Sequence, residues 1–343
     1  MWPVYGQPRA IALLQRAISE GRVAHAYLFT GPPMVGKFTL AKVFAQALNC
    51  TSDMSPCGTC RMCRTIADET HPDIRVLRPG AGDGEPTDDS AESGRSARSI
   101  GIGKISDLQH DAALLPYEAK WKVYLIDGAE SLTIPAANSL LKTLEEPASS
   151  VVLILTAVDA KILPSTIVSR CQELALGLMS FDAIEQLLLE KWAVEADRAR
   201  LLSRLSAGRI GWAIDAAGGE TLAEREAVLG SIADLATANR LDRFVYAERL
   251  ATRFTREVEA ARTALDAWLW WWRDLLLVGA GCPDLVINVD RTGELSEQAR
   301  RYTIEELYGF ILALQEARDQ LEKNVNARLA LESLMLRMPR PAR

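Results

Sequence analysis

Four of the six cysteines lie between residues 50 and 63, in the spacing C-x6-C-x2-C-x2-C of Cys50, Cys57, Cys60 and Cys63. Four thiolates can surround a zinc ion tetrahedrally and leave no coordination position for water, so such a site is structural. The segment SPCGTCRMC is polar and turn-like, unlike one that buries unpaired cysteines in a core. We therefore expect a structural Zn²⁺ site. An iron–sulfur cluster is the alternative, but nothing in the neighbouring sequence favours it.

A second motif, GPPMVGK from Gly31 to Lys37, follows a predicted strand and opens a predicted helix, as a phosphate-binding loop does. Glycines such as Gly31 and Gly36 let backbone N–H groups converge on phosphate oxygens, and the lysine adds a positive charge. The next residue is Phe38, where ATP hydrolases place the Ser or Thr that binds Mg²⁺. Thr39 lies about 100° further round the helix and is poorly placed to replace it. The motif is thus either a nucleotide-binding loop or a glycine turn kept as scaffold.

The predicted strand KVYLID ends in Asp127, a carboxylate that could face a metal ion beside this loop. Active ATPases of the P-loop superfamily place a glutamate directly after this aspartate to polarise water, whereas this chain has Gly128. Glu130 lies two positions too far along, and a helix N-cap is the structural alternative for Asp127. Phe38 and Gly128 together argue against hydrolysis, while binding of ATP and Mg²⁺ stays open.

Short apolar runs alternate with helical patterns from Ala26 to Leu176, which indicates an α/β fold with a parallel sheet covered on both faces. The site is then expected at the carboxyl ends of the strands. A helix is predicted from Ile134 to Leu144, where apolar residues fall on one face and Pro147 follows. The predicted strands are Ala26–Gly31, Asp73–Leu77, Lys122–Asp127 and Val151–Thr156, with a weaker strand pattern at Cys171–Leu176.

Beyond Gly177 the strand signals fade. Helical patterns at 181–192 and 196–205 predict a small helical domain, and a further helical unit runs from about Leu241 to Leu336. The tryptophan-rich segment WLWWWRD, 268–274, has few basic residues among its rings, which indicates a core or a subunit interface rather than a nucleic-acid surface, and we expect the interface. The Gly-, Ser- and Asp-rich segment 78–99 cannot bury enough apolar area to offset ordering and is predicted to be a mobile insertion.

Composition is that of a packed globular protein, with 48% hydrophobic and 24% charged residues. A net charge of -6 supplies no overall positive field, so any work on DNA is expected to take place inside an assembly. Polar residues interrupt the N-terminal segment, and three charges interrupt the apolar run 264–277. We expect neither a signal peptide nor a membrane span.

Six segments resemble the subunits of bacterial DNA polymerase III clamp loaders, an AAA+ family: HAYLFTGP, the four-cysteine insert, LIDGAE, NSLLKTLEEP, LPSTIVSRCQ and NVNARLALESLML. They occur in the family's order and cover nearly the whole chain. The resemblance implies a RecA-like P-loop AAA+ domain at 1–176, with a zinc knuckle at 50–63 and the insertion at 78–99. A small helical lid at 177–238 and a helical collar for oligomerisation at 239–343 would follow.

The resemblance also implies roles for single residues. Cys50, Cys57, Cys60 and Cys63 would bind the zinc, and Arg170 in the SRC motif would be an arginine finger that acts in trans on ATP held by the adjacent motor subunit. Thr156 matches the sensor position. A nucleotide pocket, functional or vestigial, would be lined by Gly31, Gly36, Lys37, Thr39, Asp127 and Thr156.

The partners implied are the gamma/tau and delta subunits and, through the complex, the sliding clamp and primed DNA, in the bacterial cytoplasm. The chain departs from a motor subunit at Phe38, Gly128 and Gly211; the last stands where the motor's lid has a sensing arginine, with Arg209 two positions earlier. These departures fit a stator subunit. One alternative is an ATP-hydrolysing gamma/tau-type motor, and another is a zinc-containing nucleic-acid-binding module, which the acidic charge opposes.

Overall fold

The computed structural model describes residues 2–52, 55–80, 99–219, 221–256, 258–322 and 325–342. The chain divides into two compact units. Unit 1 comprises Met1–Ala183 with Gly208–Trp212, and unit 2 comprises Ile184–Ala207 with Ala213–Arg343. The predicted lid range, 177–238, contributes to both units, and the three-domain division stays a prediction.

Unit 1 is built on a five-stranded sheet in the order β2-β3-β4-β1-β5, with all neighbours parallel. Every predicted strand is present. The first strand pairs with two later ones: Ala26 of β1 lies opposite Leu153 of β4, and Tyr27 of β1 lies opposite Gln172 of β5. The strands are β1 (Ala26–Thr30), β2 (Ile74–Leu77), β3 (Lys122–Ile126), β4 (Val151–Ala157) and β5 (Gln172–Ala175).

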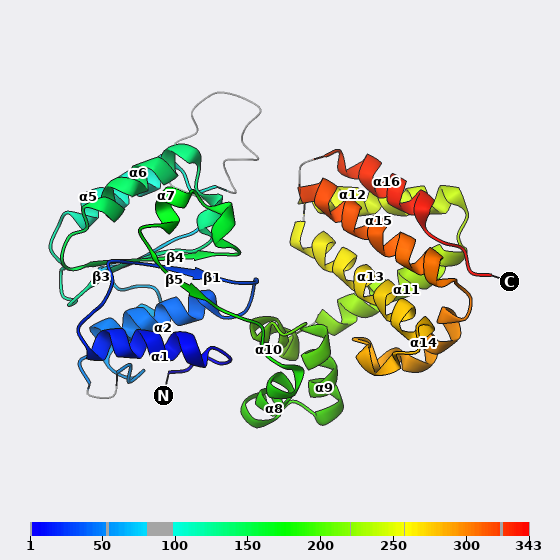
Figure 1. Ribbon diagram of the computed structural model, residues 1–343, viewed down its shortest axis with the longest axis horizontal. Helices are drawn as coiled ribbons and strands as arrows, with labels where there is room; N and C mark the ends of the chain where they lie inside the picture. The colour runs from blue at the N-terminus through cyan, green and yellow to red at the C-terminus, as the bar shows by residue number, and fades with distance from the viewer. Residues whose placement is uncertain are drawn as a thin grey trace. The chain divides into compact units, whose positions relative to one another are not determined.

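Helices cover both faces of this sheet, so that it lies between two helical layers (Figure 1). Successive strand residues point to opposite faces. Tyr27 and Phe29 enter the core beneath α1 (Pro8–Ser19) and α2 (Lys37–Asn49). Leu28 joins the other core, which is closed by α5 (Ile102–Ala112), α6 (Ile134–Glu145) and α7 (Ser165–Val168). The continuous apolar runs of the three inner strands follow from this double coverage, since β1, β3 and β4 are buried along their whole length, whereas the edge strands β2 and β5 keep exposed residues.

The remaining elements of unit 1 lie in its connections. Cysteine-rich sequence leads into α3 (Arg61–Ala67), and the short 3₁₀ turns are η1 (Ala129–Ser131) and η2 (Ala160–Ile162). Residues 81–98 of the predicted insertion lie outside the described residues.

Described helices and turns dominate unit 2, in agreement with the fading of strand signals beyond Gly177. α8 (Phe181–Trp192) and α10 (Ile210–Gly218) each have residues in both units. The other elements are α9 (Ala196–Leu205), α11 (Thr221–Thr237), α12 (Arg240–Arg256), α13 (Val258–Gly279), η3 (Pro283–Leu285), η4 (Val289–Arg291), α14 (Thr292–Ala299), α15 (Ile304–Glu322) and α16 (Ala327–Arg337).

The core of unit 2 forms around α13. Trp268, Trp271 and Trp272 are buried in it, at most 3% exposed, and the ring of Trp272 meets that of Phe310 edge-on at 4.7 Å between centroids. The expectation that the tryptophan segment lies at a subunit interface is therefore wrong for these three side chains. They face inward because a helix with apolar residues on most sides is buried within its own domain.

Candidate functional site

The phosphate-binding loop follows β1 at the carboxyl edge of the sheet, where parallel sheets place their sites. Its glycines are required by the backbone. Gly31 has φ +141°, and a Cβ there would lie 2.2 Å from the carbonyl oxygen of Leu176. Gly36 has φ +96° and is the residue before α2. The sequence motif thus corresponds to a tightly built loop that opens a helix.

Lys37 turns back onto this loop. Its Nζ donates to the carbonyl oxygens of Gly31, at 2.6 Å, and Pro32, at 2.8 Å. Burial lowers the pKa of the Lys37 ammonium, although the negative charges of Glu130 and Asp127 oppose this effect. The lysine is therefore part of the loop's own hydrogen bonding.

Asp127 and Thr156 meet at the ends of β3 and β4. The Thr156 hydroxyl donates to Asp127 Oδ1 at 2.7 Å and accepts from the backbone N–H of Gly128 at 3.0 Å. Thr156 is almost fully buried. The structure thus brings together the predicted sensor residue and the predicted metal-facing carboxylate, and it fixes both by a short chain of hydrogen bonds.

The position after the P-loop lysine carries no oxygen ligand. The ring of Phe38 lies instead beneath the guanidinium of Arg78, with 4.5 Å from Cζ to the ring centroid. Thr39 is exposed on α2 and has no hydrogen bond to Asp127 within the described part of the chain. Mg²⁺ requires near-octahedral oxygen ligands, usually a P-loop hydroxyl and an aspartate. The residues of this pocket therefore do not fit the Mg²⁺ of an ATPase.

Gly211 packs against the phosphate-binding loop within unit 1. Its N–H donates to the carbonyl oxygen of Met34 at 2.8 Å. A Cβ at position 211 would lie 2.7 Å from that same oxygen. The place where motor subunits are expected to carry an arginine is thus occupied by a backbone contact that a larger side chain would disturb.

The four clustered cysteines come together as predicted. Their Sγ atoms all lie within 4.8 Å of one another, and the Cys50–Cys60 and Cys57–Cys63 pairs are each 4.0 Å apart. Four sulfurs at about 2.3 Å from a tetrahedral zinc ion are about 3.8 Å apart. The arrangement therefore fits zinc. It joins the end of α2 at Cys50 to the start of α3 at Cys60.

Backbone N–H groups point at these sulfurs. The N–H groups of Cys57, Cys60 and Cys63 donate to the sulfur of the preceding cysteine in the cluster, at 3.3 to 3.4 Å. Hydrogen bonds, first among them that from the Cys60 N–H, lower the pKa of the Cys57 thiol to about 6. Burial raises the pKa of the Cys63 thiol to about 12. A bound cation favours the thiolate form of all four, as zinc coordination requires.

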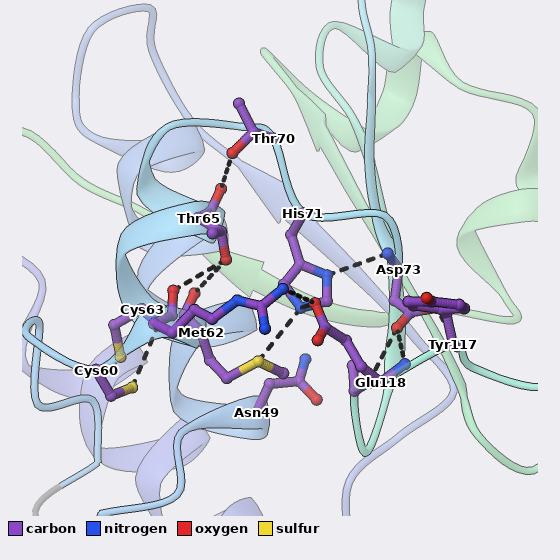
Figure 2. Close-up of polar contacts among 12 residues, drawn as sticks. Asn49, Cys60, Met62, Cys63, Thr65, Thr70, His71, Asp73, Tyr117 and Glu118 are labelled. Atoms are coloured by element: carbon purple, nitrogen blue, oxygen red, sulfur yellow. Dashed lines mark hydrogen bonds and ion pairs between the residues drawn. The ribbon is translucent and has the colours of Figure 1, made fainter.

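A polar network lies beside the cysteine cluster, between α3 and the loop that precedes β3 (Figure 2). His71 Nδ1 accepts from the Asp73 N–H at 3.1 Å, so the proton of the neutral ring is on Nε2, which lies 3.4 Å from Met62 Sδ. Burial lowers the pKa of His71. The Asp73 carboxylate accepts the N–H groups of residues 117–119 at 2.7 to 2.9 Å. The network thus fixes that loop against the end of α3.

Arg170 follows α7 and is half-buried. Its Nη2 lies 2.6 Å from Glu145 Oε1, and its Nη1 donates to the Thr166 carbonyl oxygen at 3.0 Å. The site residues predicted from the sequence thus form three places in unit 1: the P-loop pocket, the cysteine cluster and the Arg170 corner.

Three residues of these sites do not figure in the sequence prediction. Arg78 is the first residue of the predicted mobile insertion, yet Glu69 holds it in place through two hydrogen bonds. The sequence did contain a signal for Arg78: it directly follows a predicted strand, and residues that follow parallel strands gather at the edge of the sheet where the site lies. Glu69 has no comparable signal. Glu145 lies inside the LLKTLEEP motif, but its pairing with Arg170 depends on the fold.

Two sequence models of known families match the chain. The family described as DNA polymerase III, delta subunit matches residues 6–179, and the one described as DNA polymerase III, delta subunit, C terminal matches residues 251–339. With a parallel P-loop sheet, a four-cysteine cluster and a helical C-terminal unit, the chain belongs to the DNA polymerase III delta-subunit family.

One relative agrees with this assignment along almost the whole of both chains. The chain is 31% identical to the DNA polymerase III subunit delta' of Bacillus subtilis over 96% of its own length and 95% of that protein. It is 33% identical to the DNA polymerase III subunit tau of Escherichia coli over 60% of its length, but this match spans 31% of tau. A gamma subunit-related protein of Thermotoga maritima, 16% identical, aligns over 96% of this chain and 97% of the other with a TM-score of 0.45.

Helices that could cross a bilayer are not found among the described residues, because each is too short or too polar to do so.

Proposed function

We propose that this chain acts as the delta-prime, or stator, subunit of a bacterial clamp loader, which helps to load the sliding clamp onto primed DNA. The observation that carries the proposal is the full-length similarity to a delta' subunit, in contrast to the partial match with tau. The role places the chain in the cytoplasm, beside gamma/tau and delta subunits, with the clamp and primed DNA reached through the complex.

The P-loop pocket supports a stator over a motor. Phe38 offers no metal ligand, Gly128 no carboxylate for the attacking water, and Gly211 no charge toward a phosphate. Lys37 is engaged by its own loop. A chain with this pocket would take part in the clamp-loader assembly without hydrolysing ATP itself, which argues against the gamma/tau-type alternative.

Arg170 is the residue by which the stator would act on its neighbour. An arginine finger stabilises charge on the transferred phosphoryl group of ATP held by another subunit. Among the described residues, its guanidinium pairs with one carboxylate, that of Glu145, which is half exposed, so exchanging this partner for a phosphate should cost little free energy.

The cysteine cluster has a structural part in this proposal. With zinc bound by Cys50, Cys57, Cys60 and Cys63, it would fix α3 against α2, the helix that the P-loop opens. The metal would supply folding free energy, and its closed coordination sphere leaves no place for substrate.

The test is ATP turnover, first of the purified chain and then of the chain reconstituted with motor subunit, delta, clamp and primed DNA. We expect no turnover from the chain alone. In the complex, Arg170→Ala should lower clamp- and DNA-stimulated turnover at the site it serves by about tenfold or more, with assembly intact on size-exclusion chromatography.

Arg16→Ala is the matched control, because Arg16 is also a surface arginine 2.6 Å from a glutamate, Glu20, but lies on α1. It should leave turnover unchanged. Robust turnover by the isolated chain would favour the motor alternative, and equal turnover of wild type and Arg170→Ala would remove the finger assignment. Tight binding of DNA by the isolated chain would favour the nucleic-acid-binding alternative.

A further inference from the structure

The P-loop pocket of this chain contains a fixed side-chain cation. Arg78 follows β2 directly, and its Nη1 and Nη2 donate to the two carboxylate oxygens of Glu69 at 2.7 and 3.0 Å. This two-point pairing is the geometry in which an arginine holds a carboxylate most firmly. The third nitrogen, Nε, lies 3.7 Å from Asp127 Oδ2.

The partners of Arg78 are themselves held in place. Glu69 has φ +58°, a left-handed conformation at the end of α3, and its carboxylate also pairs with Lys42 Nζ at 3.2 Å. Asp127 is fixed from its other oxygen by Thr156. The guanidinium therefore meets two positioned carboxylates rather than mobile surface groups.

Phe38 completes the arrangement. A cation over the face of an aromatic ring is attracted by the ring's negative face. The Phe38 ring carries Arg78 at 4.5 Å, and the Lys42 ammonium lies 5.6 Å from the same centroid. The side chain that removes the oxygen ligand of a magnesium ion is thus the one that supports the guanidinium.

We propose that the guanidinium of Arg78 replaces the divalent cation of the P-loop site, so that this chain keeps Asp127, the start of α2 and the end of α3 in position without Mg²⁺. The metal is excluded because its aspartate already faces a positive charge, which would repel a dication, and its hydroxyl ligand is absent. This inference concerns the chain's own pocket and does not depend on its role in a clamp loader.

Arg78→Ala provides the test, because it removes the cation that Asp127 faces and leaves Glu69 with the Lys42 ammonium as its remaining described partner, so that a divalent cation can bind between the two carboxylates. In the full-length protein, 10 mM Mg²⁺ should raise the Tm of Arg78→Ala by about 3 °C relative to the same ionic strength of NaCl. The wild type should show no such difference. Adding Asp127→Asn to Arg78→Ala should remove the response.

Arg75→Ala is the matched control. Arg75 lies on β2, the strand that Arg78 follows, is 49% exposed against 46% for Arg78, and also pairs with a carboxylate, that of Asp111, at 3.2 Å. Its loss should not create a response to Mg²⁺. An equal response in both variants would mean general binding to surface carboxylates and would overturn the proposal.

Binding of Mn²⁺ to the wild type, followed by electron paramagnetic resonance with and without ATP, tests the proposal without relying on a variant's fold. We expect the wild type and Asp127→Asn to bind the same amount of Mn²⁺, because Asp127 should hold no ion in the wild type. If the wild type bound about one Mn²⁺ ion per chain and Asp127→Asn bound none, the pocket would take a metal beside Arg78 and the proposal would be overturned. The proposal would also fail if a folded Arg78→Ala/Phe38→Ser protein bound no Mn²⁺, because other features would then exclude the ion.

Discussion

Arg170 Nη2 lies 2.6 Å from Glu145 Oε1, so the corner that follows α7 is joined to the last residue of α6. Both side chains are partly exposed, at 35% and 51%. Exposed ion pairs contribute about 0–1 kcal/mol, because solvent screens them and two long side chains lose freedom. The pair can therefore hold the arginine in one orientation and still release it to a stronger anion.

Glu145→Gln tests this view of the pair. The change removes the negative charge and keeps the shape, so the proposed finger should be freed and turnover by the reconstituted complex should rise, by at most about fivefold. The measurement is steady-state ATP hydrolysis with clamp and primed DNA. A fall as large as that of Arg170→Ala would instead mean that Glu145 is needed to place the guanidinium.

Gly211→Ala should destabilise the protein. The added Cβ would lie 2.7 Å from the Met34 carbonyl oxygen, which belongs to backbone and cannot rotate away. We expect a loss of about 1–3 kcal/mol in the free energy of unfolding. Gly230→Ala is the control with the opposite sign: Gly230 lies inside α11 with open space where its Cβ would be, so alanine should stabilise by about 0.5–1 kcal/mol. Denaturant unfolding of both variants measures these changes. If Gly211→Ala stabilised the protein as much as Gly230→Ala, the close approach of position 211 to the Met34 carbonyl oxygen would be contradicted.

Cys63→Ser should remove zinc from the protein. Wild type purified under reducing conditions should contain about one zinc ion per chain, and the variant should contain nearly none and unfold at a lower temperature. Cys282 is exposed and lies outside the cluster, so Cys282→Ser should keep the metal. Elemental analysis that finds no stoichiometric zinc in the wild type would refute the site.

Asp73→Asn should alter acid stability. Burial raises the pKa of Asp73, but hydrogen bonds from the three N–H groups of residues 117–119 lower it by more, so the folded pKa lies below the usual value of an aspartic acid. A depressed carboxyl pKa stabilises the fold above the unfolded value, and this contribution is lost as pH falls through the folded one. At pH 7 the variant should therefore be less stable by about 1–3 kcal/mol, a gap that narrows below about pH 4.

Asp68→Asn is the control for this change, because Asp68 is exposed in the same segment. Its stability should follow that of the wild type from neutral to acid pH. A gap between wild type and Asp73→Asn that stayed constant down to about pH 2 would show that the N–H groups do not select the ionised form.

The sheet could be predicted from the sequence because its strands are apolar runs bounded by helical patterns. β1 and β4 are buried along their whole length, which leaves a continuous signal. The cysteine cluster was predictable for a similar reason, since its ligands lie within one short segment. Both signals are local in sequence.

Contacts between distant segments were not predictable in this way. Arg78 and Glu69 are nine positions apart with β2 between them, and nothing in this spacing indicates that they pair with each other beside Asp127, which follows another strand. The tryptophan segment was misjudged because burial within a domain and burial between subunits select the same residues. The backbone contact of Gly211 with Met34 depends on two segments whose approach only the fold defines.

The pairing of β1 has a consequence for synthesis on the ribosome. This strand comes first along the chain but lies between β4 and β5. Ala26 can therefore pair with Leu153, and Tyr27 with Gln172, only after those later residues have been synthesised. Both its edges lack partners until well over a hundred further residues have been translated. Such distant pairing slows folding and leaves apolar strands open to aggregation in the meantime. Unit 1, which contains the P-loop, therefore begins to be made early but can form its core only late, and a nascent chain of this protein should need protection by chaperones until β4 and β5 have both emerged.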